Sequence, residues 1–434
     1  MNPEDREDNR STQSDEKDAD SRGRAGFGRL RTFESFQTPA YRVYYGAMAA
    51  NWFAMNMLQM VRFLLIYRLS GSAAVTGGLA LANTIPTLLV ALIGGTLGDR
   101  MQKKYLLLVG RVGLALLALA IAVLLSTGYL SPARPGSWWI LIVSAVFEGS
   151  INGLMYPTNM SIIPEIVGGG RLMNAIFLSS MGQNICKLAG PALAGFFVDA
   201  FGFSADYYFM TGLYVVGAVF TLFLPRTEIP PTTKPRGSVM SDTLQGLKHL
   251  GSESIVLLIV LFTVCHVVAG QPFNQLLSVF TESILKVSAS KLGLLTSLAG
   301  IGALIGSLVL ASIRVRRRGL ILLMSGVVMG VPVVIFTYFH QWTVALLMMP
   351  FIGLGQTMHQ GFASTLVQTY AAPEYRARMQ SFLMVASSLA GFGTFTAGLL
   401  ATSIGVETAI GSFAIFLTLI SIVFIVFSKL RKLE

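Results

Sequence analysis

Long apolar segments separated by short polar ones constrain this chain more than any other feature of its sequence. A helix that crosses a bilayer needs about 20 mostly apolar residues. Twelve segments meet that requirement, at approximately 41–67, 74–98, 105–127, 137–160, 173–198, 204–224, 252–280, 290–312, 319–338, 343–367, 379–402 and 406–428. The composition agrees, because 53% of the 434 residues are hydrophobic and only 12% are charged. The sequence therefore predicts an all-α membrane protein with twelve transmembrane helices.

Polar segments divide the chain into regions. The first 20 residues hold eight of the 21 acidic residues, and the segment 1–34 as a whole predicts a disordered cytoplasmic tail. This tail is either a solvated extension or a segment that binds a partner or the lipid surface. Residues 225–251 are polar and contain several prolines. We therefore expect six helices at 35–224, a central cytoplasmic loop at 225–251, six more helices at 252–428 and a cytoplasmic end at 429–434.

The distribution of lysine and arginine predicts the orientation of the chain. If the amino terminus is cytoplasmic, the outward loops hold only Arg68, Arg134, Lys286 and Lys291, and the other loop cations face inward. Cytoplasmic loops of membrane proteins carry an excess of these residues. We therefore expect a multi-pass plasma-membrane protein with both termini in the cytoplasm. The net charge of +11 is spread over many loops instead of one patch, which argues against a nucleic-acid partner.

Three landmarks occur twice at nearly the same spacing. Ala91-Leu92-Ile93-Gly94 matches Ala303-Leu304-Ile305-Gly306, Pro164-Glu165 matches Pro373-Glu374, and Phe147-x-Gly149-x-x-Asn152 resembles Phe351-x-Gly353-x-x-Gln356. This repetition indicates duplication of a six-helix unit. The prediction is therefore two pseudo-symmetric bundles of six helices each.

A short charged connection follows the second predicted helix, and it reads Gly94-Gly95-Thr96-Leu97-Gly98-Asp99-Arg100-Met101-Gln102-Lys103-Lys104. It resembles the loop between helices 2 and 3 of the major facilitator superfamily, although that family usually has glycine where Gln102 stands. The resemblance implies a twelve-helix secondary transporter whose substrate site lies between its halves. It also implies a conformational gate, with candidates Gly95, Asp99, Arg100, Lys103, Lys104, Arg376 and Arg378. The alternative is that the loop is only a cytoplasmic anchor of positive charge.

A second resemblance lies in the fifth predicted helix. Its helix-packing residues Gly190, Pro191 and Gly195 resemble the signature of the exporter branch of the superfamily, which often carries a further glycine where Lys187 or its neighbours stand. Pro164-Glu165 and Pro373-Glu374-x-Arg376-x-Arg378 resemble the subfamily that contains enterobactin and macrolide exporters. The resemblance implies efflux and does not identify a substrate.

Ionisable residues inside a membrane are costly, so each is a candidate for function. Glu148 is the only acid expected near the middle of a helix, and Lys187 is expected at a similar depth. In one interpretation Glu148 binds and releases a proton while Lys187 tunes its affinity. In the other, the two form a permanent buried ion pair between the fourth and fifth helices. His359 is a second candidate for proton binding.

Polar residues also predict a substrate cavity. In the family that the chain resembles, helices 1, 4, 7 and 10 line the central cavity. The candidates on these helices are Asn56, Gln59, Arg62, Asn152, Gln271, Asn274, Gln275, Gln356 and Gln360. Gln183 of the fifth helix is a further candidate, because it lies on the same side of that helix as Lys187. Arg62 either binds an anionic substrate group or extends toward the outer surface as an anchor.

Other kinds of chemistry lack support in the sequence. There is no G-x-x-x-x-G-K-[ST] phosphate loop, and the four histidines and two cysteines lack metal-ligand spacing. We therefore expect no cofactor, no metal and no enzymatic activity. The predicted function is proton-coupled efflux of a small amphipathic molecule by a monomer that works by alternating access. The alternatives are proton-coupled uptake of a nutrient or metabolite, and a receptor or scaffold that has a transporter fold without transport.

Overall fold

The computed structural model describes residues 31–168, 171–225, 254–312, 317–371 and 375–433. The side chains of 31–33, 92–100, 254, 309–312 and 376–378 lie outside that description. The described part of the chain contains helices and connecting turns and no strand.

The first half of the chain forms one group of helices. A short 3-10 helix η1 (Arg31–Gln37) precedes α2 (Pro39–Ser70), α3 (Ala73–Arg100), α4 (Lys103–Ser126), α5 (Trp139–Val167) and α6 (Leu172–Leu222). Pro39 stands in the first turn of α2, where a missing backbone N–H costs nothing, and Gly71 ends that helix in the left-handed conformation. α6 is 51 residues long and changes direction at Gly202, whose φ of 84° is open to glycine at little cost. The predicted helices 173–198 and 204–224 are therefore joined by a kink.

The second half forms the other group. It contains α8 (Ser254–Phe280) with the π-helical turn η3 (Thr281–Leu285), α9 (Ala289–Ser312), α10 (Arg318–Tyr338), α11 (Trp342–Tyr370), α12 (Arg376–Ser388), α13 (Ala390–Ile404), α14 (Val406–Phe427) and η4 (Lys429–Lys432). The predicted helix 379–402 is interrupted at Leu389, so that α12 and α13 together take its place.

By length and composition, nine helices in the described part can cross a membrane. α6 is counted once among them, although its two arms around Gly202 are long enough for two crossings. α2 and α11 are also long, at 32 and 29 residues, and fall outside this set because they carry many polar side chains. The structure is therefore consistent with the twelve predicted crossings.

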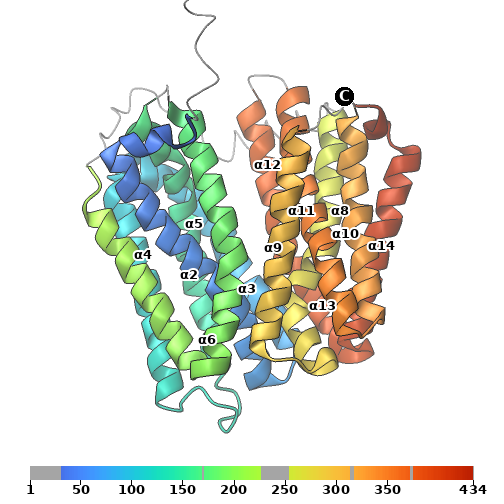
Figure 1. Cartoon of the computed structure of the whole chain (residues 1–434), viewed down its shortest axis with the longest axis horizontal. Coiled ribbons are helices and arrows are strands. Elements are labelled where there is room, and N and C mark those ends of the chain that lie inside the picture. The colour runs from blue at the N-terminus through green and yellow to red at the C-terminus, as the bar shows by residue number, and fades with distance from the viewer. Residues whose placement is uncertain (1–30, 169–170, 226–253, 313–316, 372–374, 434) are drawn as a thin grey trace, which may run out of the picture.

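The helices form two bundles (Figure 1). α2, α4, α5 and α6 lie in one half and α8 to α14 in the other, and the beginning of α2 and the carboxyl end lie at the same end of the molecule. Equivalent glycines support the repeat, because a β-carbon at Gly149 of α5 would collide with the carbonyl of Asn83 in α3, and one at Gly353 of α11 with the carbonyl of Ala299 in α9. The landmarks that repeat in the sequence thus make the same close helix crossing in each half.

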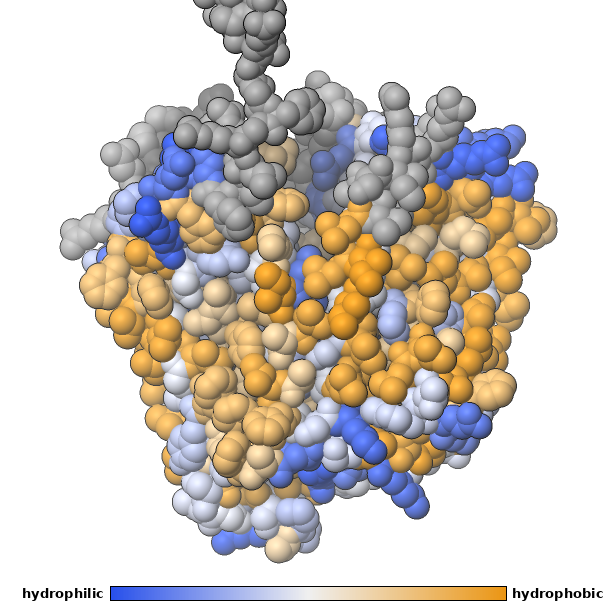
Figure 2. Space-filling model, in the orientation of Figure 1, coloured by the Kyte–Doolittle hydropathy of each residue, from blue (hydrophilic) through white to orange (hydrophobic). Residues whose placement is uncertain are grey.

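The face of the molecule drawn in Figure 2 is apolar over most of its height. A broad hydrophobic band separates hydrophilic ends, and large side chains such as Val109, Leu308 and Phe416 are exposed. An exposed apolar surface of this extent fits contact with lipid, in which every backbone polar group is satisfied within its own helix.

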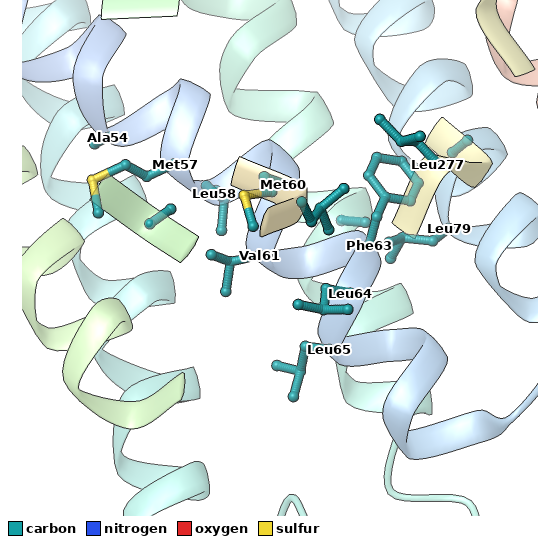
Figure 3. Close-up of a cluster of buried hydrophobic side chains, with 14 of the residues drawn as sticks. Ala54, Met57, Leu58, Met60, Val61, Phe63, Leu64, Leu65, Leu79 and Leu277 are labelled. Carbon is teal, nitrogen blue, oxygen red and sulfur yellow. The ribbon is translucent and has the colours of Figure 1, made fainter. Parts of the chain in front are cut away.

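The buried apolar core continues from one bundle into the other. One cluster holds side chains from α2 to α6 together with side chains from α8 to α11, α13 and α14. Figure 3 shows part of this cluster, in which the side chains of Phe63 in α2 and Leu79 in α3 lie in the same part of the view as Leu277 of α8. A second cluster, which includes Ile259, Leu322 and Leu430, belongs to the carboxyl-terminal bundle and lies toward the termini.

Candidate functional site

A pocket of about 210 Å³ lies between the two bundles. It is bounded by α2, α6, α8, α9 and α11, and we refer to it as the central pocket. Its lining consists of Asn56, Gln59, Met60, Phe63, Lys187, Pro191, Gln271, Asn274, Leu277, Ser278, Leu292, Thr296, Ala299, Met349, Gln356 and Gln360. Both bundles therefore build the site, as expected from the sequence.

Seven of the predicted residues line this pocket, namely Asn56, Gln59, Lys187, Gln271, Asn274, Gln356 and Gln360. Arg62, Asn152, Gln183 and Gln275 do not. The expectation that the fourth helix lines the cavity is wrong for this pocket, since α5 provides none of its lining, while α6 and α9 do. The sequence could not reveal this, because a helical face can be assigned from spacing but the neighbour that it faces cannot.

Some amide groups of the central pocket are already engaged. The Asn56 side chain donates to the Trp52 carbonyl at 2.7 Å, one turn earlier in α2. The Asn274 side chain donates to Gln271 Oε1 at 3.4 Å. Lys187 is exposed, and its Nζ has neither an ion pair nor a hydrogen bond to any described residue. Among the described lining residues, Lys187 is thus the one cation without a partner, and it lies beside a set of neutral amides.

Glu148 is paired with Arg62, inside the amino-terminal bundle. The two side chains are only 12% and 7% exposed, and Asn152 lies 3.5 Å from the second carboxylate oxygen. The predicted pairing of Glu148 with Lys187 is therefore wrong. The two residues were placed at similar depths, but Glu148 faces α2 and Lys187 faces the central pocket.

A small cavity adjoins this ion pair. Its volume is about 20 Å³, and Ser144, Tyr207 and Tyr214 line it together with Arg62 and Glu148. Both tyrosines are almost completely buried. A cavity of this size has room for one water molecule, and its other lining residues, Leu58, Leu114, Leu117, Ala118 and Ile121, are apolar. The pair is thus a compact polar site within one bundle, separate from the central pocket.

Sequence reasoning missed two buried charged residues of this bundle. Asp206, near the start of the second arm of α6, is 0% exposed and neither of its oxygens has a partner among the described residues. Arg111 of α4 is also 0% exposed and donates to the carbonyl of Gly217 and the hydroxyl of Thr221. Both stand inside or at the edge of apolar segments, which is the signal that identified Glu148 and Lys187 and would have identified these.

His359 lies in the carboxyl-terminal bundle and outside the central pocket. Its ring stacks on that of His266 with centroids 3.8 Å apart and planes 4° apart. Both residues are buried, and neither nitrogen of His359 has a hydrogen-bond partner in the described part of the chain. His359 is therefore buried within its own bundle and does not line the central pocket.

Close contacts between the bundles lie on the side away from the termini. A β-carbon at Gly195 of α6 would collide with the Ala289 carbonyl of α9, and one at Gly293 with the Pro191 carbonyl of α6. Gly190, by contrast, faces α2, where a β-carbon would lie 3.0 Å from Cβ of Asn56. The predicted packing motif therefore joins α6 to its own bundle through Gly190 and to the other bundle through Pro191 and Gly195.

Polar groups reinforce this contact. The Asp199 carboxylate accepts from the backbone N–H groups of Ala289, at 3.1 Å, and Ser290, at 2.7 Å, and so caps α9. Further toward the middle, Ser297 Oγ donates to the Leu188 carbonyl at 2.6 Å. A related contact between the bundles joins α3 to α13, where a β-carbon at Gly391 would collide with Thr84.

Arg68 and Glu282 form an ion pair between α2 and η3, with N–O distances of 3.0 and 3.1 Å. Both side chains are about one-third exposed, at 33% and 32%, so solvent weakens the pair. We predict that Arg68→Ala raises access to the central pocket from this side only a few-fold, as measured by the labelling rate of a cysteine introduced at Thr296. The charge exchange Arg68→Glu with Glu282→Arg should return the rate to that of the parent, and a failure to do so would contradict a role for the pair.

The predicted gate is described only in part. Lys103 pairs with Glu165 and donates to the Ser161 carbonyl, while Lys104 donates to the carbonyls of Leu222 and Leu224. Both lysines thus hold helix ends of the amino-terminal bundle together. The side chains of Gly95, Asp99, Arg100, Arg376 and Arg378 lie outside the described residues.

Comparison with known proteins supplies the remaining observation about this site. The sequence model of the Major Facilitator Superfamily matches residues 44–394. The uncharacterized MFS-type transporter YfiS of Bacillus subtilis (strain 168) is 25% identical, over 82% of this chain and 84% of its own. The staphyloferrin A transporter of Staphylococcus aureus is 21% identical, over 90% and 93%. The enterobactin exporter EntS of Salmonella choleraesuis is 25% identical, over 72% and 74%.

Solved structures share the fold. The nucleoside transporter NupG superposes with a TM-score of 0.72 at 14% identity, covering 90% of this chain and 99% of that one. A bacterial homologue of the human lysosomal transporter Spinster, in an inward-facing and unoccupied conformation, superposes with a TM-score of 0.71 at 13% identity, covering 93% and 98%.

Proposed function

The chain belongs to the major facilitator superfamily of secondary transporters, and on that premise we propose that it exports a small amphipathic molecule across the cell membrane in exchange for protons. The observation that carries this proposal is the central pocket, which both bundles line and which close contacts seal on one side. A site of this kind reaches the other side of the membrane only if the bundles separate there. Alternating access about the pocket is therefore the proposed mechanism.

The state described here fits an inward-facing transporter. The contacts of α6 with α9 and of α3 with α13 occupy the halves of these helices that lie away from the termini. With both termini in the cytoplasm, as the distribution of cations predicts, these contacts close the pocket to the outside. We take the protein to act as a monomer, because both bundles of a single chain complete the site.

Two observations support export over uptake. One relative is named an enterobactin exporter. The residues that resemble an exporter signature, Pro191 and Gly195, also form the contact between bundles that must open during transport.

Glu148 is the proposed proton carrier, with Arg62 as its counter-ion. Protonation would remove the negative charge of the pair and free the arginine. Tyr207, Tyr214 and Ser144 also face this site, and Asp206 stands next to Tyr207 in the chain. Arg62 shares α2 with Asn56 and Gln59, so a change in its pairing would act on the helix that forms one wall of the central pocket.

The proposal is tested with the full chain reconstituted in vesicles and supplied with a compound panel and a pH gradient. We expect export of a compound to be accompanied by proton movement in the opposite direction, and Glu148→Gln to remove that movement. Glu407→Gln is the matched control, because Glu407 interacts with His340 at 3.2 Å outside both polar sites. Transport that keeps its pH dependence in Glu148→Gln would contradict the proton role, and co-movement of protons would contradict export.

A further inference from the structure

Lys187 is the only ionisable side chain among the described residues that line the central pocket. It stands in the first arm of α6 and is exposed to the pocket, whereas its neighbour Cys186 is buried against α2. The acid expected to neutralise it, Glu148, is committed to Arg62. Among the described residues, no acid therefore neutralises the positive charge of Lys187, which lies in the pocket at membrane depth.

An unpaired cation in a medium of low polarity is unfavourable, so in membrane proteins such charges face a water-filled cavity, a partner or a substrate. Lys187 lines the pocket and makes no ion pair or hydrogen bond with a described residue of its own bundle. Amide side chains on three other helices surround the same space, and their N–H groups can donate to an anion. They are Asn56, Gln59, Gln271, Asn274, Gln356 and Gln360.

We propose that Lys187 binds an anionic group, such as a carboxylate, on the transported molecule, and that the amides complete its coordination. This proposal rests on the proposed function in taking the central pocket as the transport site. Apart from the hydroxyl groups of Ser278 and Thr296, the remaining lining is apolar, and it includes Met60, Phe63, Leu277, Leu292 and Met349. The site is thus suited to an anion with an apolar or aromatic body, and it repels organic cations.

The location of Lys187 also connects binding to the movement of the bundles. The next residue, Leu188, accepts a hydrogen bond from Ser297 across the contact between the bundles. Gly300 packs on Leu188, with a β-carbon there lying 3.2 Å from its Cα. An anion held by Lys187 therefore sits beside the contact that has to separate for release on the other side.

The test uses three probes that share a skeleton and differ in charge, which are naphthoate, naphthamide and naphthylmethylammonium. Binding to the purified full chain is measured by calorimetry and by the shift of the thermal unfolding midpoint. We expect the parent protein to bind naphthoate in preference to the other two. Lys187→Gln should lose about tenfold or more in affinity for naphthoate, since hydrogen bonds to charged groups contribute this much. Lys187→Arg should retain the preference, and Lys187→Glu should transfer it to naphthylmethylammonium.

Lys291→Gln is the matched control for loss of a positive charge, because Lys291 lies over the Trp342 ring and does not line the pocket. Equal binding of the three probes, no binding of naphthoate by the parent, or an unchanged preference in Lys187→Gln would overturn the proposal. If the probes bind with a charge preference that depends on Lys187 but none of them is transported, that result would instead contradict the proposed function. Export of anions with an unchanged KM in Lys187→Gln would contradict only the role of Lys187.

Discussion

Replacement of Gly293 by leucine is expected to displace the transporter from the conformation described here. Even a β-carbon at Gly293 would collide with the Pro191 carbonyl, and the backbone of Pro191 and Ala192 in α6 leaves no room for a larger side chain. Overpacking of a tight contact costs about 1–3 kcal/mol. Since about 1.4 kcal/mol changes an equilibrium tenfold, the population closed on this side should fall by roughly tenfold to a hundredfold.

The measurement is the distribution of distances between spin labels at the far ends of α2 and α8, in a chain without its native cysteines. Gly293→Leu should move the distribution toward longer distances. Gly212→Leu is the matched control, because a β-carbon at Gly212 meets no atom within 4 Å and the residue is exposed. Identical distributions in Gly293→Leu and the parent would show that α6 and α9 do not form the seal.

Removal of Arg62 is expected to have the second large effect. Arg62→Met leaves the Glu148 carboxylate buried without a counter-ion, and loss of one partner of a buried ion pair typically costs about 3–5 kcal/mol. The thermal unfolding midpoint of the protein in detergent should fall accordingly. The double variant Arg62→Met with Glu148→Met should regain most of the loss, because it removes both charges.

Glu148→Gln should be milder than Arg62→Met, since the amide retains an oxygen that accepts from Arg62. This difference allows the transport assay of Glu148→Gln to be interpreted on a folded protein. If Arg62→Met leaves the midpoint unchanged, the two side chains do not depend on each other and the assignment of the pair to proton coupling fails.

The fold could be predicted from the sequence because its main determinants are local. Apolar segments of membrane length, cation-rich loops and repeated landmarks each depend only on residues close together in the chain. The junctions were less predictable. The kink at Gly202 joins two helices without a loop, and the break at Leu389 has no glycine or proline at the position itself.

The central pocket was predictable in its chemistry and less so in its geometry. Amides of α2, α8 and α11 were identified by their polarity inside apolar segments. The partner of Glu148 cannot be predicted in this way. The position of Glu148 along α5 sets its depth in the membrane, but tertiary packing decides which neighbouring helix it meets. Arg111 and Asp206 were overlooked, although each is a charge in or beside an apolar segment.

The accessibility of one pocket residue tests the central claim of a single site open to one side at a time. A cysteine placed by Gln356→Cys, in a chain whose native cysteines are replaced, is treated with a membrane-impermeant maleimide from each side. We predict rapid labelling from the side of the termini and slow labelling from the other side, with the ratio reversed by Gly293→Leu. Equal labelling from both sides would contradict the claim of a single site open to one side at a time. So would an absence of labelling from either side, both with and without Gly293→Leu.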